Sequence, residues 1–154
     1  MCACGQTKET TFDQYGISFT CPAGWEVTEA EDYGPTQYIS VEKNGFNASS
    51  VVTIATSDEE YELEEYLKVF QGSFKEQDVY KNLRLQPAKA EAYGKHQGIS
   101  SSYTADVLTL PHEGKMYVFR TGRQIVCIVE QSATEDRKVS QAGFETIRDS
   151  FSED

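Results

Sequence analysis

The cysteines and histidines are the residues of this 154-residue chain that could do chemistry, and their positions argue against it. Thiol catalysis needs a thiolate beside a histidine. Cys21 and Cys127 each lie in a run of alternating apolar residues, where burial disfavours a thiolate, so we expect two small core side chains. His96 follows a Tyr-Gly turn and His112 follows a proline, and we expect both in solvent. The sequence therefore predicts no catalytic residue and no enzyme activity.

Motifs for metals and cofactors are absent from the sequence as well. The six carboxylates between Asp58 and Glu65 lack the Asp-x-Asp-x-Asp-Gly loop that converges oxygens on calcium. Cys2 and Cys4 are too close in sequence for the Cys-x-x-Cys spacing of zinc sites. There is no Gly-rich phosphate loop, nucleophile elbow or His-Glu-x-x-His motif. We expect no metal and no cofactor, and the sequence leaves open a Cys21–Cys127 disulfide.

The first ten residues have the character of a tether, with Cys4 as a candidate modification site. Cys4 follows Ala3 and precedes Gly5 and a polar segment, so this start resembles the cleavage region of a bacterial lipoprotein, in which the cysteine carries the lipid. The apolar segment that precedes such a site is not among these residues. We expect residues 1–10 to tether the protein to the bacterial cell envelope, at its periplasmic or outer face. A disordered N-terminus in the cytoplasm is the alternative.

The net charge of −11 limits the classes of partner. All of the acidic excess lies in residues 1–66, which hold 13 acidic and 2 basic residues, whereas residues 67–154 hold 12 of each. Nucleic acid is excluded because phosphate binding requires clustered cations. We expect a charged partner to be a protein with a basic surface. No run approaches the roughly 18 apolar residues of a membrane span, so only a lipid anchor would hold this chain at a membrane.

The acidic residues concentrate around residues 26–32 and at the start of the first predicted helix. Exposed tyrosines near them could line a binding surface, although tyrosine more often covers half-buried sheet. We expect a partner site between the loop at 29–37 and that helix. Its candidate residues are Asp32, Tyr33, Tyr38, Asp58, Glu59 and Glu62.

Alternating apolar residues predict most of the chain to be β-strand. The last two strands are apolar on both faces, which is typical of central strands covered on both sides. We expect turns at 93–95, 111–114 and 122–123. The predicted strands are 17–21, 25–28, 38–42, 50–55, 83–92, 98–110, 116–121 and 124–131.

Two helices are predicted. Ser57 and Glu60 form a capping box, so the first helix should begin there. It carries one apolar stripe, consisting of Leu63, Tyr66, Leu67, Phe70 and Phe74. The second helix should run from about Glu135 to Ser152 with Thr134 as its N-cap. Its predicted inward residues are Val139, Gly143, Phe144, Ile147 and Phe151.

These elements predict an α+β domain with an antiparallel sheet of about 6–8 strands between two helices, in α/β/α layers. Tyr15-Gly16-Ile17-Ser18-Phe19, Cys21-Pro22-Ala23-Gly24-Trp25 and the closing helix from Phe144 to the pair Ser150-Phe151 resemble the PsbP-like family, which includes the Mog and DcrB branches. The resemblance covers residues 11–154 as a single domain and implies a PsbP/Mog-like sandwich.

Across that family the fold is a non-catalytic binding or assembly module. It occurs in photosystem subunits, a regulator of a nuclear-transport GTPase and many bacterial lipoproteins. The resemblance therefore implies a non-enzymatic, lipid-anchored binding protein of the bacterial envelope. A cytosolic adaptor or chaperone of the same fold is the alternative, and a small hydrolase is less favoured. A fold alone does not choose among these functions.

Overall fold

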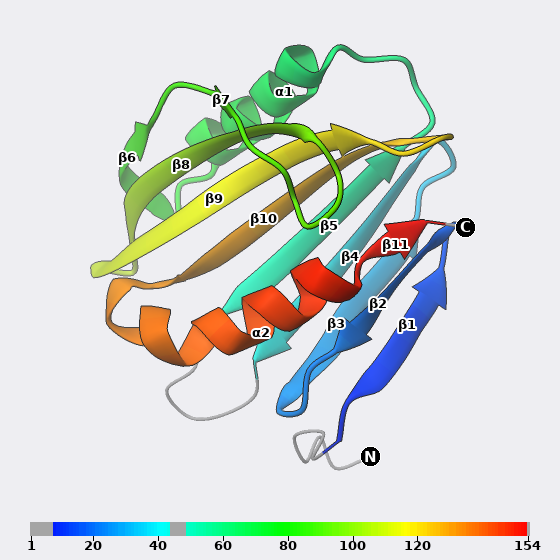
Figure 1. Cartoon of the computed structure of the whole chain (residues 1–154). Helices are drawn as coiled ribbons and strands as arrows, with labels where there is room; N and C mark the ends of the chain where they lie inside the picture. Colours follow the sequence, from blue (N-terminus) through cyan, green and yellow to red (C-terminus); the bar gives the residue numbers. More distant parts are fainter. Residues whose placement is uncertain (1–7, 44–48, 154) are drawn as a thin grey trace.

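The computed structural model, which describes residues 8–43 and 49–153, contains two antiparallel sheets and two helices (Figure 1). The large sheet has the order β3-β4-β5-β10-β9-β8-β6, and the short β7 pairs with β8 on the same side as β6. Its strands are β3 (Trp25–Asp32), β4 (Thr36–Lys43), β5 (Val51–Ser57), β6 (Tyr80–Leu85), β7 (Lys89–Ala90), β8 (Gly98–Val107), β9 (Leu110–Arg120) and β10 (Ile125–Ala133). The helices are α1 (Leu63–Glu76) and α2 (Arg137–Ser150).

A second, small sheet was not predicted. It has the order β1-β2-β11 and consists of β1 (Thr10–Gln14), β2 (Ile17–Cys21) and β11 (Ser152–Glu153). The small sheet and α2 cover one face of the large sheet, and α1 covers the other (Figure 1). The predicted α+β layers with two helices are confirmed. No helix of the described ranges combines the length and apolar composition needed to cross a membrane.

The apolar stripe of α1 packs as the sequence predicted. Tyr66 and Leu67 are buried against the large sheet, where they join a cluster that includes Met116, Val118 and Cys127. The other members of the stripe are partly buried at the edge of the same cluster. Burial of this stripe holds α1 on the sheet, because packing supplies most of a helix's stability in a folded protein.

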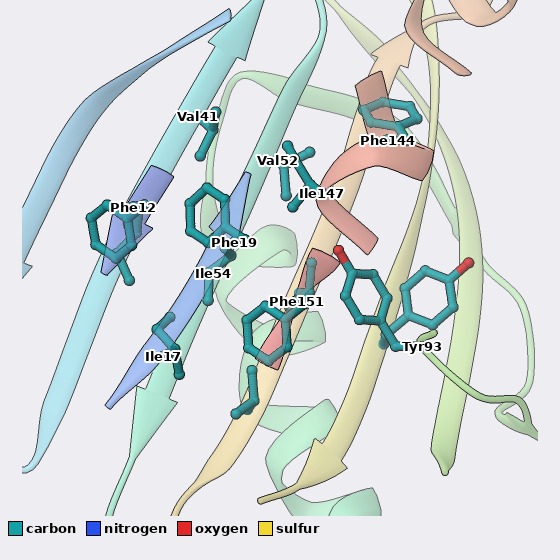
Figure 2. Packing of buried hydrophobic residues seen from close by; sticks show 14 of the residues in the cluster. Phe12, Ile17, Phe19, Val41, Val52, Ile54, Tyr93, Phe144, Ile147 and Phe151 are labelled. Carbon is teal, nitrogen blue, oxygen red and sulfur yellow. The ribbon is translucent and has the colours of Figure 1, made fainter. Parts of the chain in front are cut away.

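The larger core lies on the α2 face and is rich in aromatic rings (Figure 2). Phe151, directly after α2, meets the rings of Tyr93 and Phe119 edge-on at centroid distances of 5.9 and 5.6 Å. Ile147, one turn earlier, is fully buried in the same cluster. This packing confirms that Phe151 anchors the end of the closing helix. Every residue of β10 is buried, as expected for a central strand.

The first helix begins later than predicted. Ser57 is buried at the end of β5, and its hydroxyl accepts a hydrogen bond from the amide of Glu59 at 3.1 Å, so it forms a local turn and not a capping box. α1 starts at Leu63, and Glu62 occupies its N-cap without a side-chain capping bond. Asp58, Glu59 and the residues up to Tyr61 therefore form a loop, because pairing of β5 with β4 and β10 extends to Ser57.

The turn predicted at 111–114 is also wrong. β8 and β9 are joined by a two-residue turn at Leu108 and Thr109, whose φ angles are 51° and 69°. Two-residue hairpins need positive φ at both positions, which Asn-Gly usually provides, so this sequence carries no signal for the turn. His112 and Gly114 lie inside β9 instead. Glycine is needed at position 114 of this strand, because the ring of Tyr103 occupies the space that a β-carbon would fill.

The closing helix differs from its prediction at both ends. It begins at Arg137, after a 3-10 turn at Thr134–Asp136, and Asp136 rather than Thr134 occupies its N-cap position. It ends at Ser150, because the next residues pair with β2 as β11. Val139, predicted to face inward, is 61% exposed.

Candidate functional site

Four of the six candidate partner residues lie at one end of the large sheet. Asp32 ends β3, Tyr33 follows it, and Asp58 and Glu59 follow β5. A backbone hydrogen bond joins the β3–β4 turn to the β5–α1 loop, in which the amide of Asp58 donates to the Pro35 carbonyl at 3.0 Å. All four residues are exposed, Tyr33 to 65%. The structure thus brings together two acidic segments that are 25 residues apart in sequence.

Glu62 and Tyr38 are placed differently. Glu62 is exposed at the N-cap of α1, at the far end of the same loop. Tyr38 lies in β4, where it lines a cavity of about 120 Å³ with Phe70 and Phe74 of α1. Burial raises the pKa of Tyr38. Tyr38 therefore belongs to the layer beneath α1 and not to the exposed surface that carries Asp32 and Asp58.

The acidic carboxylates of this surface make no ion pair with the residues that the structure describes. Asp32 accepts hydrogen bonds from the Gly34 amide and the Gln37 side chain, both at 3.0 Å, and these two bonds lower its pKa. Glu59 accepts from the Tyr61 hydroxyl at 3.1 Å. We give the name acidic end to five exposed residues of the β3–β4 turn and of the β5–α1 loop up to the N-cap of α1: Asp32, Tyr33, Asp58, Glu59 and Glu62.

The histidines are buried, contrary to the prediction that both would lie in solvent. His96 is 7% exposed, stacks on Phe119 and bonds through Nε2 to Glu153 at 2.5 Å. His112 is also 7% exposed and bonds through Nδ1 to the Leu110 carbonyl at 2.8 Å. Seven residues of β9 separate His112 from Phe119, which is more than 20 Å at about 3.3 Å per residue. The two histidines therefore do not share a site.

Cys21 and Cys127 are free thiols in separate cores on opposite faces of the large sheet. A disulfide between them is therefore excluded, because the sheet lies between the two side chains. Burial raises the pKa of both thiols and keeps them protonated. Within residues 8–43 and 49–153, no three His, Cys, Asp or Glu side chains converge to hold a metal ion. Cys4 lies outside the described residues.

A groove that the sequence did not reveal lies on the α2 face, beside the helix. Its floor is formed by β8, β9 and β10, and its walls by α2 and the segment at 86–91, enclosing about 400 Å³. The strand register aligns Ser102, Lys115 and Glu130 in one row across the floor. Polar side chains thus replace the apolar core where α2 leaves the sheet uncovered.

A buried ion pair fixes one side of the groove. Arg148 of α2 donates to both carboxylate oxygens of Glu130, with Nη2 to oxygen distances of 2.9 and 3.0 Å. The guanidinium also lies over the rings of Tyr93 and Tyr117, at 6.0 and 5.8 Å from their centroids. Burial raises the pKa of Glu130, although Arg148 acts to lower it.

Two further ion pairs line the groove. Lys115 donates to the two oxygens of Glu91 at 3.0 and 3.2 Å. Burial opposes ionisation of Glu91, but hydrogen bonds from Ser100 and Lys115 lower its pKa. Arg137 lies 3.7 Å from Glu113. Each charge that lines the groove therefore has an opposite charge beside it.

No family model matches the chain, and no curated protein matches its sequence. Its fold, however, matches solved structures. The whole chain aligns with 97% of a cyanobacterial PsbP from Synechocystis sp. PCC 6803, with a TM-score of 0.66 and 11% identity. This chain has a PsbP-like fold.

Two other solved structures share this PsbP-like fold. The alignment with LpqN of Mycobacterium tuberculosis covers 94% of this chain and 89% of LpqN, with a TM-score of 0.56 and 10% identity. A protein of Bacteroides thetaiotaomicron aligns with 97% of the chain over 49% of its own length, with a TM-score of 0.59 and 11% identity. At such identities the similarity establishes the fold and not the role.

The residues that suggested the PsbP-like fold are structural. Trp25 is buried against α2, where its ring meets Phe144 at a centroid distance of 5.8 Å and contacts Gly143. Gly24 adopts a φ of 83° in the turn before Trp25, which glycine accepts without strain. These contacts join β3 to the closing helix, so the short motifs report packing rather than chemistry.

Proposed function

We propose that this protein is a non-enzymatic binding module of the bacterial cell envelope that docks a basic protein partner on its acidic end. The PsbP-like fold supports the envelope part of the proposal, because it occurs in an LpqN that is involved in cell envelope biogenesis. The observation that carries the proposal is the exposed aromatic ring of Tyr33, next to Asp32 on a turn that is hydrogen-bonded to the loop carrying Asp58 and Glu59. Such a surface attracts a basic partner at long range and offers one large ring for contact.

The chemistry of the described residues supports binding over hydrolysis. The buried thiols are protonated, the histidines are far apart, and the charges of the groove are paired with one another. A small hydrolase of the thiol or histidine-assisted kind would need a nucleophile within hydrogen-bond reach of a histidine, whereas His96 bonds to Glu153 and His112 to a backbone carbonyl. A binding module needs only the exposed surface.

Lipid attachment at Cys4 is the proposed means of retention at the envelope. When the full gene is expressed in its native host, the mature protein should begin at Cys4 and exceed its polypeptide mass by the mass of the lipid. Intact-mass spectrometry of the membrane fraction measures this. The Cys4→Ser variant should lack the added mass and leave the membrane fraction. An unmodified chain in the cytoplasm would contradict the anchor and favour a cytosolic adaptor of the same fold.

Charge reversal tests the acidic end. The variant D32K/E59K/E62K should weaken association with the partner at least about tenfold, because it removes the long-range attraction. The measurement is the yield of photo-crosslinking to the partner from a benzoylphenylalanine at position 33 in cells.

The matched control is E76K/D78K/E135K, which changes the net charge equally at exposed carboxylates away from the acidic end. Crosslinking should persist in this control, and the crosslinked protein should have a basic surface. Equal crosslinking in both triple variants would show that the acidity serves solubility and not docking.

A further inference from the structure

We infer that the groove on the α2 face binds a neutral, polyhydroxylated ligand such as a sugar unit. This site is separate from the acidic end and does not depend on the function proposed for that surface. The groove exists because α2 crosses the sheet without covering β8 and β9 (Figure 1). Its volume of about 400 Å³ falls in the range of small-molecule sites.

The pairing of charges determines which ligands the groove accepts. Glu130 and Arg148 have side chains only 7% and 22% exposed, so a charged ligand that drew one away would leave the other buried and unpaired. An anion approaching Lys115 meets Glu91 at 3.0 Å from the same ammonium group. A cation meets the basic partners of the same pairs. The groove therefore disfavours a ligand with net charge.

Hydrogen-bonding capacity nevertheless remains in the groove. Glu113, on the floor, has a buried carboxylate oxygen, Oε1, that no donor of the described residues satisfies. Arg148 uses Nε and Nη2 for Glu130, which leaves Nη1 as a donor. The groove lining thus keeps one unsatisfied acceptor, on Glu113, and one unused donor, on Arg148.

A hydroxyl group suits this lining because it both donates and accepts. A ligand with several hydroxyls can donate to Glu113 and accept from Arg148 without separating an ion pair. Ser102 and Ser132 add small hydroxyl side chains to the floor, and Phe144 supplies an apolar wall. A polyhydroxylated ring therefore fits the chemistry of the groove better than an anion, a cation or an apolar molecule.

Titration of the isotopically labelled full chain, followed by NMR, tests this inference. The probes are glucose, galactose, mannose, N-acetylglucosamine and maltose, with methylammonium as a cationic probe and inorganic phosphate as an anionic probe. At least one sugar should shift the resonances of Lys115, Glu130 and Arg148 in a saturable manner. The dissociation constant should change less than about twofold between 50 and 300 mM salt, because no net charge is neutralised.

Two variants locate the binding. Ser102→Phe fills the floor of the groove and should weaken binding at least tenfold. Ser73→Phe, at an exposed position of α1 on the opposite face of the sheet, should leave binding unchanged. Glu113→Ala, which removes the unsatisfied acceptor and leaves the floor open, should also weaken binding. This second variant provides the test if Ser102→Phe does not fold. The inference is overturned if no sugar at 50 mM shifts the resonances of groove residues, if the shifts map elsewhere, or if methylammonium or phosphate binds there instead.

Discussion

Replacing Arg148 with methionine should lower the free energy of unfolding by about 3–5 kcal/mol at neutral pH, the usual cost of removing one partner from a buried ion pair. Methionine keeps an apolar stem against Tyr93 and Tyr117 but leaves the Glu130 carboxylate buried without a counter-charge. The loss therefore comes from the stranded charge and not from a cavity. Urea denaturation followed by circular dichroism measures it.

The same variant should depend on pH in a defined direction. The folded-state pKa of Glu130 already lies above the ordinary carboxyl value of 4.5, and losing Arg148 raises it further. A carboxyl group with a raised folded-state pKa binds a proton more readily in the folded chain than in the unfolded chain. The folded protein therefore gains stability as the pH falls toward 4.5 and loses stability as the pH rises. The destabilisation should be smaller at pH 5 than at pH 8.

The double variant E130Q/R148M is the control, because glutamine keeps the shape of Glu130 without its charge. It should recover most of the stability that R148M loses, giving strong coupling between the two positions. Additive losses, or a loss by R148M that is the same at pH 5 and pH 8, would show that Glu130 is not stranded by the substitution.

Replacing Trp25 with alanine should also cost about 3–5 kcal/mol, because its ring fills the space between β3 and α2. Gly143 shows how tightly that ring is held, since a methyl group on Gly143 would overlap the indole. Gly143→Ala in the natural sequence should therefore cost about 1–3 kcal/mol by overpacking.

In the Trp25→Ala background the sign of the Gly143→Ala effect should reverse. The overlap disappears with the ring, and alanine stabilises a helix by about 1 kcal/mol relative to glycine. Denaturation of the four chains of this cycle gives the coupling energy. An equal cost of Gly143→Ala in both backgrounds would mean that the methyl group does not meet Trp25.

Much of the fold was predictable because apolar periodicity is a local property of the chain. The apolar stripe of α1, the buried β10 and the anchoring by Phe151 follow from spacing alone and are confirmed. Errors arose where a local signal met a tertiary constraint. Pro111 and Gly114 are typical of turns, yet pairing with β8 extends β9 through them, and the ring of Tyr103 fills the space above the glycine.

The candidate sites were less predictable because they depend on contacts between distant segments. Two acidic segments were visible in the sequence, and strand order joined Asp32 to Asp58 at one sheet end. The same order placed Tyr38 beneath α1, away from that surface. A signal for the groove was present in Glu130, a carboxylate beside the apolar run of β10, but its partner Arg148 was unknown until α2 was placed.

The sequence by itself determined the composition of the layers: which residues face a core, the acidity of the first half, and the lack of a catalytic motif. These features depend on residue type and on the 2.0 and 3.6 residue periods, which any segment carries alone. Only the tertiary structure decided that His96 and His112 are buried and that Glu91, Lys115, Glu130 and Arg148 line one groove. Burial and charge pairing are relations between segments, and they exist only once strand register and the placement of α2 fix the distances.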